Sequence, residues 1–485
     1  MIVPRILLAA ACLAVLSGCA GAGGQVRRAA PPREAHPPVV FIAFDEFSTT
    51  SLVDARGRID AVRYPNFAAL ARDGNWFPYA TAPSDETGRA MEALLTGSVP
   101  DRGRPPTSAA NPRNLFTLLG RRYRIRASEE VTSLCPRRLC RGARRQTKRS
   151  VRATRKPTLF FKHALLPHAP WRYLPSGRQY TRRDPIPDWG HAFFVPWVST
   201  QKYQRHLLQL GFTDRLLGSA LARLKEQGLY DRAIIVVTAD NGEGFGRLGN
   251  GHEVTGRNVG DIALAPLLIK SPFQRHGAAL GRHVRTVDVL PTVARLAGVR
   301  PSWPMQGHSV YGRLARRIPS SATVFQRSGR SYTFTLAALR RWARAARRRK
   351  IQLFGSGDAQ PGLYRIGPYR SLVGSATSSL HVASARVTRA ALNGGGAFHA
   401  VRLLASFVPA YVSGRLTRPG GHPPRAVAVA INGRIAATSP TYRVHRGGPL
   451  YFGAIVQESA LQEGRNDVRA FSVSGPTRSP RLRAL

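Results

Sequence analysis

The stretch AIIVVTADNGEGFG, residues 233–246, indicates both the fold and the place of the chemistry. Its first five residues are apolar, as in a buried parallel strand, and polar residues and glycines follow at the carboxyl end. The earlier stretch VVFIAFDEFS, residues 39–48, has the same form and reaches Asp45 and Glu46. Ligands of open α/β sheets bind beyond the carboxyl ends of the strands. Two strands that end in acidic residues therefore predict a metal site lined by oxygen atoms.

Strand-like and helical stretches alternate as far as about residue 312. This alternation predicts an α/β fold with a largely parallel central sheet flanked by helices. Beyond residue 363, short alternating stretches separated by turn residues predict a C-terminal β-rich domain of sandwich type. Further strands are expected over 158–168 and 262–272, and helices over 66–77 and 198–230, the last with Leu216 on its apolar face.

The chain begins MIVPRILLAAACLAVLSGCAG, in which one arginine, an apolar run and small residues form a typical secretory signal. Residues 16–19 (LSGC) resemble the lipobox of bacterial lipoproteins, which implies cleavage before Cys19 and attachment of lipid there. The alternative is an ordinary cleaved signal. The apolar run is too short to span a membrane. We therefore expect an extracytoplasmic protein, lipid-anchored to the cell membrane.

The chain has 485 residues and a net charge of +47. Such a charge is compatible with a solvated surface or with nucleic-acid binding. An exported lipoprotein meets anionic lipids and envelope polymers first, and no compact basic motif with interleaved aromatic residues is present. We expect an anionic envelope lipid or polymer as substrate and partner, and no nucleic acid.

Two cysteines remain beyond the signal and the lipobox, Cys135 and Cys140 in LCPRRLC. Outside the cytoplasm, a pair this close favours a disulfide that closes a tight loop. A metal pair is the weaker alternative, because no other cysteine or clustered histidine accompanies it.

Four residues offer oxygen donors to one site. Asp45 and Asp240 carry carboxylates, Asn241 a carbonyl and Thr87 a hydroxyl. This set favours one hard divalent ion, Ca²⁺, Mg²⁺ or Mn²⁺, over zinc. Such an ion lowers the pKa of a neighbouring hydroxyl and neutralises a bound sulfate or phosphate ester, so Thr87 is a candidate nucleophile. Taken alone, Thr87 reads as a helix N-cap.

The order of several motifs is more specific than any single residue. They are Asp45 after its strand, YPNF (64–67), Thr87 followed by ALLTG (93–97), PHAPW (167–171), TADNGE (238–243) and DVLPT (288–292). Over residues 39 to about 310 this order resembles the sulfatase branch of the alkaline-phosphatase superfamily. The later LYRIGP and NGRIAA segments are similar to those of actinobacterial sulfatase-like envelope lipoproteins. The resemblance implies an alkaline-phosphatase-like fold.

The resemblance also implies roles. Asp45 matches the first metal carboxylate, Glu46 a second candidate metal ligand, and Asp240 and Asn241 the late ligand pair. Thr87 stands where sulfatases have the Cys or Ser that is oxidised to formylglycine, and the Cys/Ser-x-Pro-x-Arg signature is absent. A threonine nucleophile resembles lipoteichoic acid synthases and phosphoethanolamine transferases, whereas Asn241 resembles sulfatases.

Three more residues are candidates at the site. In relatives, a histidine at the position of His168 contacts the ester or protonates the leaving group, which suits an imidazole. His252, in a Gly-His pair, resembles a histidine that contacts substrate or metal. Arg89 could bind the ester through its guanidinium fork. Each also has an alternative interpretation without a role in catalysis. His168 could be a hydrogen-bonded loop histidine, His252 a solvated loop residue and Arg89 a surface arginine.

These features predict a metal-dependent sulfatase-like hydrolase or transferase that acts on sulfate or phosphate esters at the cell envelope. A transferase of phosphoglycerol or phosphoethanolamine and a degenerate, non-catalytic envelope-binding protein remain open. The expected organisation is a signal peptide (1–18), a flexible tether (19–38), a catalytic domain (39–312), a connector with a basic helix (313–362) and a β-sandwich-like accessory domain (363–485).

Overall fold

A computed structural model describes residues 36–140, 151–181, 195–246, 253–312, 319–357, 361–384, 388–417 and 423–485. Its central sheet has the strand order β2-β7-β6-β1-β5-β4. The strands are β1 (Val39–Asp45), β2 (Asn75–Trp76), β4 (Arg124–Ser128), β5 (Thr158–Pro167), β6 (Ile234–Ala239) and β7 (Leu267–Lys270). Strands β6, β1, β5 and β4 run parallel, and β7 pairs antiparallel with β6. The predicted, largely parallel sheet is confirmed.

The register of the central strands brings distant acidic residues together. Strand β1 lies between β5 and β6, with Phe44 opposite Ala239 and Asp45 opposite Pro167. Strands β1 and β6 therefore end side by side, and Asp240 is the first residue after β6. The predicted strand over 262–272 is shorter than expected, because Ile262 ends a short helix and pairing begins only at Leu267.

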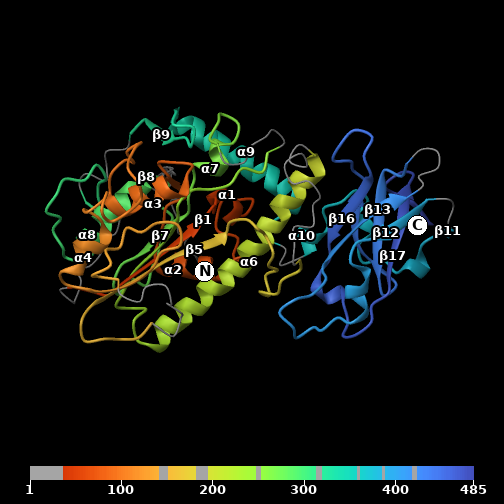
Figure 1. The fold of residues 1–485 in the computed structure, drawn as a ribbon, viewed down its shortest axis with the longest axis horizontal. Helices are drawn as coiled ribbons and strands as arrows, with labels where there is room; N and C mark the ends of the chain where they lie inside the picture. Colours follow the sequence, from red (N-terminus) through yellow and green to blue (C-terminus); the bar gives the residue numbers. More distant parts are fainter. Residues whose placement is uncertain are drawn as a thin grey trace, which may run out of the picture.

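Helices cover both faces of the sheet (Figure 1). Alternate residues of β1 point to opposite faces. Val39, Phe41 and Ala43 pack with α3, α4 and α8, whereas Val40 and Phe44 pack with α2 and α6. The helices are α1 (Thr49–Leu52), α2 (Pro65–Asp73), α3 (Thr87–Thr96), α4 (Leu115–Gly120), α6 (Pro196–Glu226), α7 (Val259–Ile262) and α8 (Val289–Leu296). Each of the two short strands β3 (Tyr79–Thr81) and β8 (His283–Arg285) pairs with the other.

Two sheets, antiparallel except where β11 pairs parallel with β18, form the C-terminal β-rich region, which was predicted (Figure 1). One has the order β11-β18-β17-β14-β15 and the other β12-β13-β16, and Val412 and Phe452 of the second pack with Val427 and Ala470 of the first. The strands are β11 (Val382–Ala383), β12 (Arg389–Leu392), β13 (Tyr411–Thr417), β14 (Ala426–Ile431), β15 (Arg434–Pro440), β16 (Leu450–Ile455), β17 (Val468–Ser474) and β18 (Arg481–Ala484). The exact domain boundaries remain predictions.

A hairpin and a basic helix connect the two regions. They are β9 (Ser321–Phe325), β10 (Ser331–Thr335) and α9 (Leu336–Phe354), followed by the short α10 (Pro361–Tyr364). Arg349 of α9 pairs with Asp261 of α7 at 2.6 Å between Nη2 and Oδ2. Asp261 also accepts a hydrogen bond from Thr50 of α1 at 3.1 Å. Helix α9 is thereby tied to the segment that follows β1.

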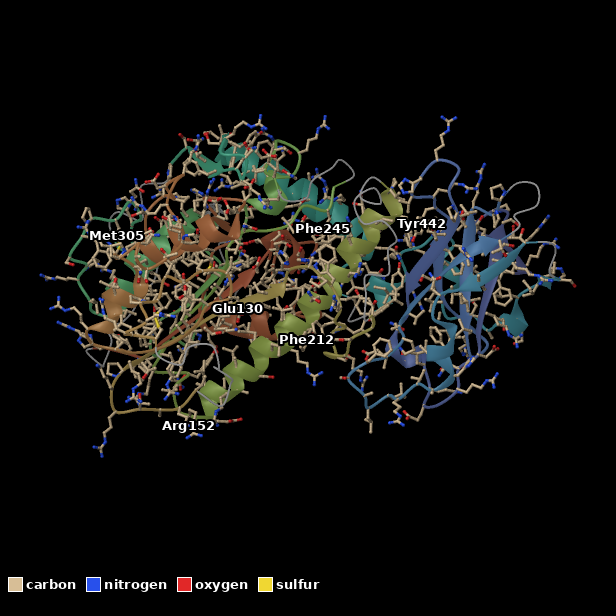
Figure 2. The ribbon with its side chains drawn as sticks, in the orientation of Figure 1. Glu130, Arg152, Phe212, Phe245, Met305 and Tyr442 are labelled. Atoms are coloured by element: carbon tan, nitrogen blue, oxygen red, sulfur yellow. A yellow bond between two sulfur atoms is a disulfide. The ribbon has the colours of Figure 1, made fainter. Side chains whose placement is uncertain are left out.

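The amino-terminal half of α6 is buried between the central sheet region and the C-terminal sheets. Trp197 and Gln201 donate hydrogen bonds to the carbonyl of Gly453 at 3.1 and 2.8 Å. Figure 2 shows Phe245 and Tyr442 on opposite sides of this half. Leu216, expected on the apolar face, is 41% exposed, whereas Leu217, Leu221 and Leu224 of the second half pack with α2 and the sheet.

None of the helices in the described ranges combines the length and the apolar character needed to cross a bilayer. The predicted signal peptide and Cys19 lie outside the described residues.

Candidate functional site

A cluster of acidic side chains lies where β1 and β6 end. Asp45, Glu46 and Asp240 are each at most 3% exposed. The amides of Glu46 and Asn241 donate to Asp240 Oδ1 at 3.0 and 2.6 Å, and the amide of Asp240 donates to the carbonyl of Phe44 at 3.1 Å. Glu46 has a φ of 52°, the left-handed turn that ends β1. The backbone therefore holds Asp240 beside Asp45.

Thr87 is the first residue of α3 and reaches the cluster from the side. Its hydroxyl donates to Asp45 Oδ1 at 3.5 Å. The amino end of a helix carries a partial positive charge, which favours anions there. The side-chain Nδ2 of buried Asn241 donates to Asp240 Oδ2 at 3.4 Å. The structure thus brings Asp45, Thr87, Asp240 and Asn241 together at one point, as the motifs predicted for a metal site.

His163 also belongs to this cluster, and the sequence analysis missed it. It lies on β5 opposite Ala43, whose side of the sheet faces α3. Asp45, His163 and Asp240 each offer one ligand atom, and these atoms lie within 4.8 Å of one another. The available signal was a histidine inside a largely apolar strand, FFKHALL. That signal does not tell which strand is its neighbour.

Two carboxylates of the cluster, those of Asp45 and Asp240, are buried close to each other. Burial raises the pKa of Asp45 to about 7, and Glu46 adds to the rise. Burial, and then Asp45, raises the pKa of Asp240 well above its usual value. Within the described ranges no lysine or arginine forms an ion pair with either aspartate. A divalent cation fits this donor set, because it would supply the missing positive charge.

His168 stands at the rim of the cluster. Its Nε2 lies 3.3 Å from Glu46 Oε1, and its side chain is 36% exposed whereas that of Glu46 is 4% exposed. Gln209 of α6 donates to the carbonyl of His168 at 2.8 Å and accepts from the amide of Arg172 at 2.9 Å. The loop that carries His168 is therefore fixed to α6. Glu46 joins this histidine to the acidic cluster.

The remaining candidates have different surroundings. Arg89 pairs with Glu86 at 3.1 Å and donates to the carbonyl of Gln326 at 3.2 Å, so its guanidinium already has two protein partners. Cys135 and Cys140 form a disulfide. His252 lies outside the described residues.

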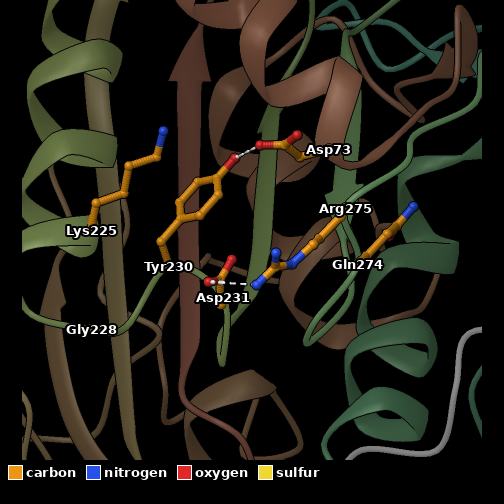
Figure 3. Close-up of a pocket in the computed structure, with 7 residues that line it drawn as sticks. All are labelled: Asp73, Lys225, Gly228, Tyr230, Asp231, Gln274 and Arg275. Atoms are coloured by element: carbon orange, nitrogen blue, oxygen red, sulfur yellow. Dashed lines mark hydrogen bonds and ion pairs between the residues drawn. The ribbon is translucent and has the colours of Figure 1, made fainter.

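A cavity of about 380 Å³ lies at the other end of the sheet (Figure 3). Tyr230, which precedes β6, donates to Asp73 Oδ2 at 2.6 Å, and Arg275 pairs with Asp231 at 3.7 Å. The acidic cluster follows β6, so this cavity does not open onto it.

Comparisons with known proteins agree with the motifs. Residues 144–299 match the family model described as Sulfatase. Arylsulfatase K of Danio rerio is 30% identical over 110 residues, which cover 21% of this chain and 20% of that protein. The chain thus matches only about a fifth of the length of this curated relative.

Two solved structures are similar over much of the chain. One is BT4656 in complex with its substrate D-glucosamine-2-N,6-O-disulfate, with 15% identity and a TM-score of 0.46 over 62% of this chain and 87% of that chain. The other is the phosphonate monoester hydrolase of Agrobacterium radiobacter, with 16% identity and a TM-score of 0.43 over 59% and 80%. The match to the Sulfatase family thus spans residues 144–299, and this stretch includes His163, Asp240 and Asn241 of the acidic cluster.

Proposed function

We propose that this chain is a metal-dependent hydrolase of sulfate or phosphate esters in which Thr87 is the nucleophile. One observation carries the proposal. The Thr87 hydroxyl, at the amino end of α3, lies 3.5 Å from Asp45 Oδ1 in a buried acidic cluster, in which neither Asp45 nor Asp240 forms an ion pair with a lysine or arginine of the described residues. A hydroxyl in this setting has no evident structural task, since Thr87 is not the N-cap of its helix.

Asp45 and Asp240 would hold the cation, with Asn241, Thr87 and Glu46 beside them. When bound, a divalent ion supplies positive charge that favours the deprotonated form of a nearby hydroxyl and offsets the charge of the ester. The hydrogen bonds that the backbone amides of Glu46 and Asn241 donate to Asp240 orient its carboxylate before any ligand binds. This preorganisation is the contribution of the fold.

The residues then divide the reaction. Thr87 Oγ, its proton released to water, forms a bond to sulfur or phosphorus, and the bond from that atom to the leaving oxygen breaks. The leaving oxygen takes the bonding electrons and a proton from His168, which Glu46 orients at the rim. A water oxygen next bonds to the sulfur or phosphorus. The bond from Thr87 Oγ to that atom breaks, Thr87 Oγ takes a proton from solvent to regain its hydroxyl, and His168 recovers its proton from the attacking water.

We further propose that the enzyme acts outside the cytoplasm, anchored by lipid at Cys19, on an anionic envelope lipid or polymer. The signal-like start, the lipobox resemblance and the net charge of +47 support this location and partner. The C-terminal sheets support α6, whose Gln209 fixes the His168 loop. That contact favours a bracing role for the accessory region.

A transferase is the second candidate, and the identity of residue 87 favours it. This chain has threonine where sulfatases have the formylglycine precursor, and it lacks the modification signature, so residue 87 resembles the nucleophile of phosphoethanolamine transferases. In the transferase an acceptor alcohol of a lipid or polymer takes the place of water in the second step.

The test uses the purified protein stripped with EDTA and reloaded with Mn²⁺, Ca²⁺ or Mg²⁺. Chromogenic sulfate and phosphate monoesters and diesters are offered to wild type, Thr87→Ala and Thr87→Ser. We expect metal-dependent turnover in wild type, a loss of at least about 1000-fold in Thr87→Ala and partial activity in Thr87→Ser. Mass spectrometry of acid-quenched protein should find the adduct on the peptide that contains Thr87.

Two results would overturn the proposal. Full activity in Thr87→Ala would exclude this nucleophile. A wild type that binds metal but turns over none of the esters, with or without an added acceptor alcohol, would identify a non-catalytic envelope-binding protein.

A further inference from the structure

His163 is a buried histidine without a hydrogen-bond partner. Its side chain is 0% exposed, and neither ring nitrogen has a partner. Leaving a buried polar atom unpaired costs about 1 to 3 kcal/mol, and buried polar groups without partners are rare in folded proteins. An atom that is not part of the polypeptide should therefore contact one of the ring nitrogens.

The position of the ring indicates what that interaction is. His163 Nε2 lies 3.6 Å from Asp45 Oδ2, which is longer than a hydrogen bond. Two ligands that each lie about 2.1 Å from one ion stand roughly 3 to 3.5 Å apart. Asp240 completes the group, with all three ligand atoms within 4.8 Å of one another. The spacing fits three ligands around one cation.

The neighbours of the ring offer no other explanation. Lys162, the preceding residue on β5, points to the opposite face and bonds Ser128 Oγ at 2.9 Å and Glu130. His163 lies instead opposite Ala43, on the side of the sheet that faces α3 and Thr87. The fold thus directs one nitrogen donor into a site whose other donors are oxygen.

We propose that His163 is a ligand of the cation and that its nitrogen makes the site select a first-row transition ion, such as Mn²⁺ or Zn²⁺, over Ca²⁺ and Mg²⁺. Carboxylates and carbonyls alone suit Ca²⁺ and Mg²⁺, whereas imidazole is a preferred ligand of transition ions. The sequence analysis considered only oxygen donors and favoured Ca²⁺, Mg²⁺ or Mn²⁺ over zinc. A histidine ligand shifts the expected metal preference toward transition ions. The inference rests on the metal dependence in the proposed function and not on the type of ester.

The experiment measures binding rather than activity. EDTA-stripped full-length protein is titrated with Mn²⁺, Zn²⁺, Ca²⁺ and Mg²⁺ by calorimetry, for wild type, His163→Asn and His206→Leu. His206 is the matched control, because it is also 0% exposed with both ring nitrogens unpartnered, but it packs among Trp171, Tyr203 and Phe245. Pulsed EPR of the Mn²⁺-loaded protein reports directly on nitrogen coordination.

We expect wild type to bind Mn²⁺ and Zn²⁺ at least about 10-fold more tightly than Ca²⁺. His163→Asn should lose on the order of 100-fold in affinity for both transition ions, since loss even of an outer partner costs 10- to 100-fold, and should change Ca²⁺ affinity little. The EPR signal of one imidazole nitrogen should be present in wild type and in His206→Leu and absent in His163→Asn.

The outcomes separate this inference from the proposed function. Binding that favours Ca²⁺, or Mn²⁺ coordination without nitrogen in wild type, overturns the role of His163 and leaves a metal-dependent enzyme standing. A protein that binds none of the four ions overturns both.

Discussion

Replacing Asp45 by Asn is expected to stabilise the metal-free protein and to abolish its response to divalent ions. Asp45 is 2% exposed, and burial raises its pKa from 3.8 to about 7. For a carboxyl, this rise means that the folded protein keeps a proton which the unfolded chain has already released. The free energy of unfolding therefore falls as the pH rises from about 4 to about 7.

The size of the effect follows from the same pKa. Each pKa unit corresponds to about 1.4 kcal/mol, so ionised Asp45 costs up to about 4 kcal/mol of stability at pH 8. Asparagine does not ionise, and its carbonyl can still accept the hydrogen bond from Thr87. We expect the free energy of unfolding of metal-free Asp45→Asn to exceed that of wild type by about 2 to 4 kcal/mol at pH 8, and by much less at pH 4.

Saturating Mn²⁺ should reverse this order. An ion present at about 1000 times its dissociation constant stabilises the protein that binds it by about 4 kcal/mol. Wild type should gain this stabilisation from Mn²⁺, whereas Asp45→Asn should not, because it lacks one charged ligand. The assay is urea unfolding followed by tryptophan fluorescence from pH 4 to pH 8, with EDTA or with Mn²⁺.

Glu92→Gln is the matched control. Glu92 is also buried, with its pKa raised to about 7 by burial, but it lies inside α3 rather than in the acidic cluster. It should gain stability at high pH and keep the full response to Mn²⁺. The reasoning is refuted if metal-free Asp45→Asn is less stable than wild type at pH 8, or if Mn²⁺ stabilises both proteins equally.

Three further predictions concern other parts of the molecule. His168→Asn should lower kcat about 100-fold for alkyl esters and much less for nitrophenyl esters, whose leaving groups need no proton; equal losses would argue against proton donation. Arg349→Met leaves buried Asp261 without its partner at 2.6 Å and should cost about 3 kcal/mol in urea unfolding, partly recovered in Arg349→Lys; an unchanged unfolding curve would contradict this. Replacing Cys135 and Cys140 together by Ser opens their short loop and should cost about 2 kcal/mol; equal stability of wild type and variant under oxidising conditions would show that the disulfide is not stabilising.

Much of the fold could be predicted because its signals are local. An apolar run followed by an acidic residue is recognisable at both Asp45 and Asp240, and parallel strands place their carboxyl ends at one edge of the sheet. The helix expected over 198–230 is present as Pro196–Glu226. Its buried face was predicted less well. Gln201 is buried because the C-terminal sheets, distant in sequence, cover it.

The amino-acid sequence alone determined which strands end in oxygen donors, that they belong to a largely parallel sheet, and that Thr87 opens a helix in the same region. It did so because strand and helix periodicity and strand-end chemistry are properties of contiguous residues. The tertiary structure alone decided that β5 lies beside β1, and thus that His163 joins Asp45 and Asp240. It also decided that Glu46 links His168 to the cluster. Strand order depends on how helices pack across the whole sheet, and no local pattern carries that information.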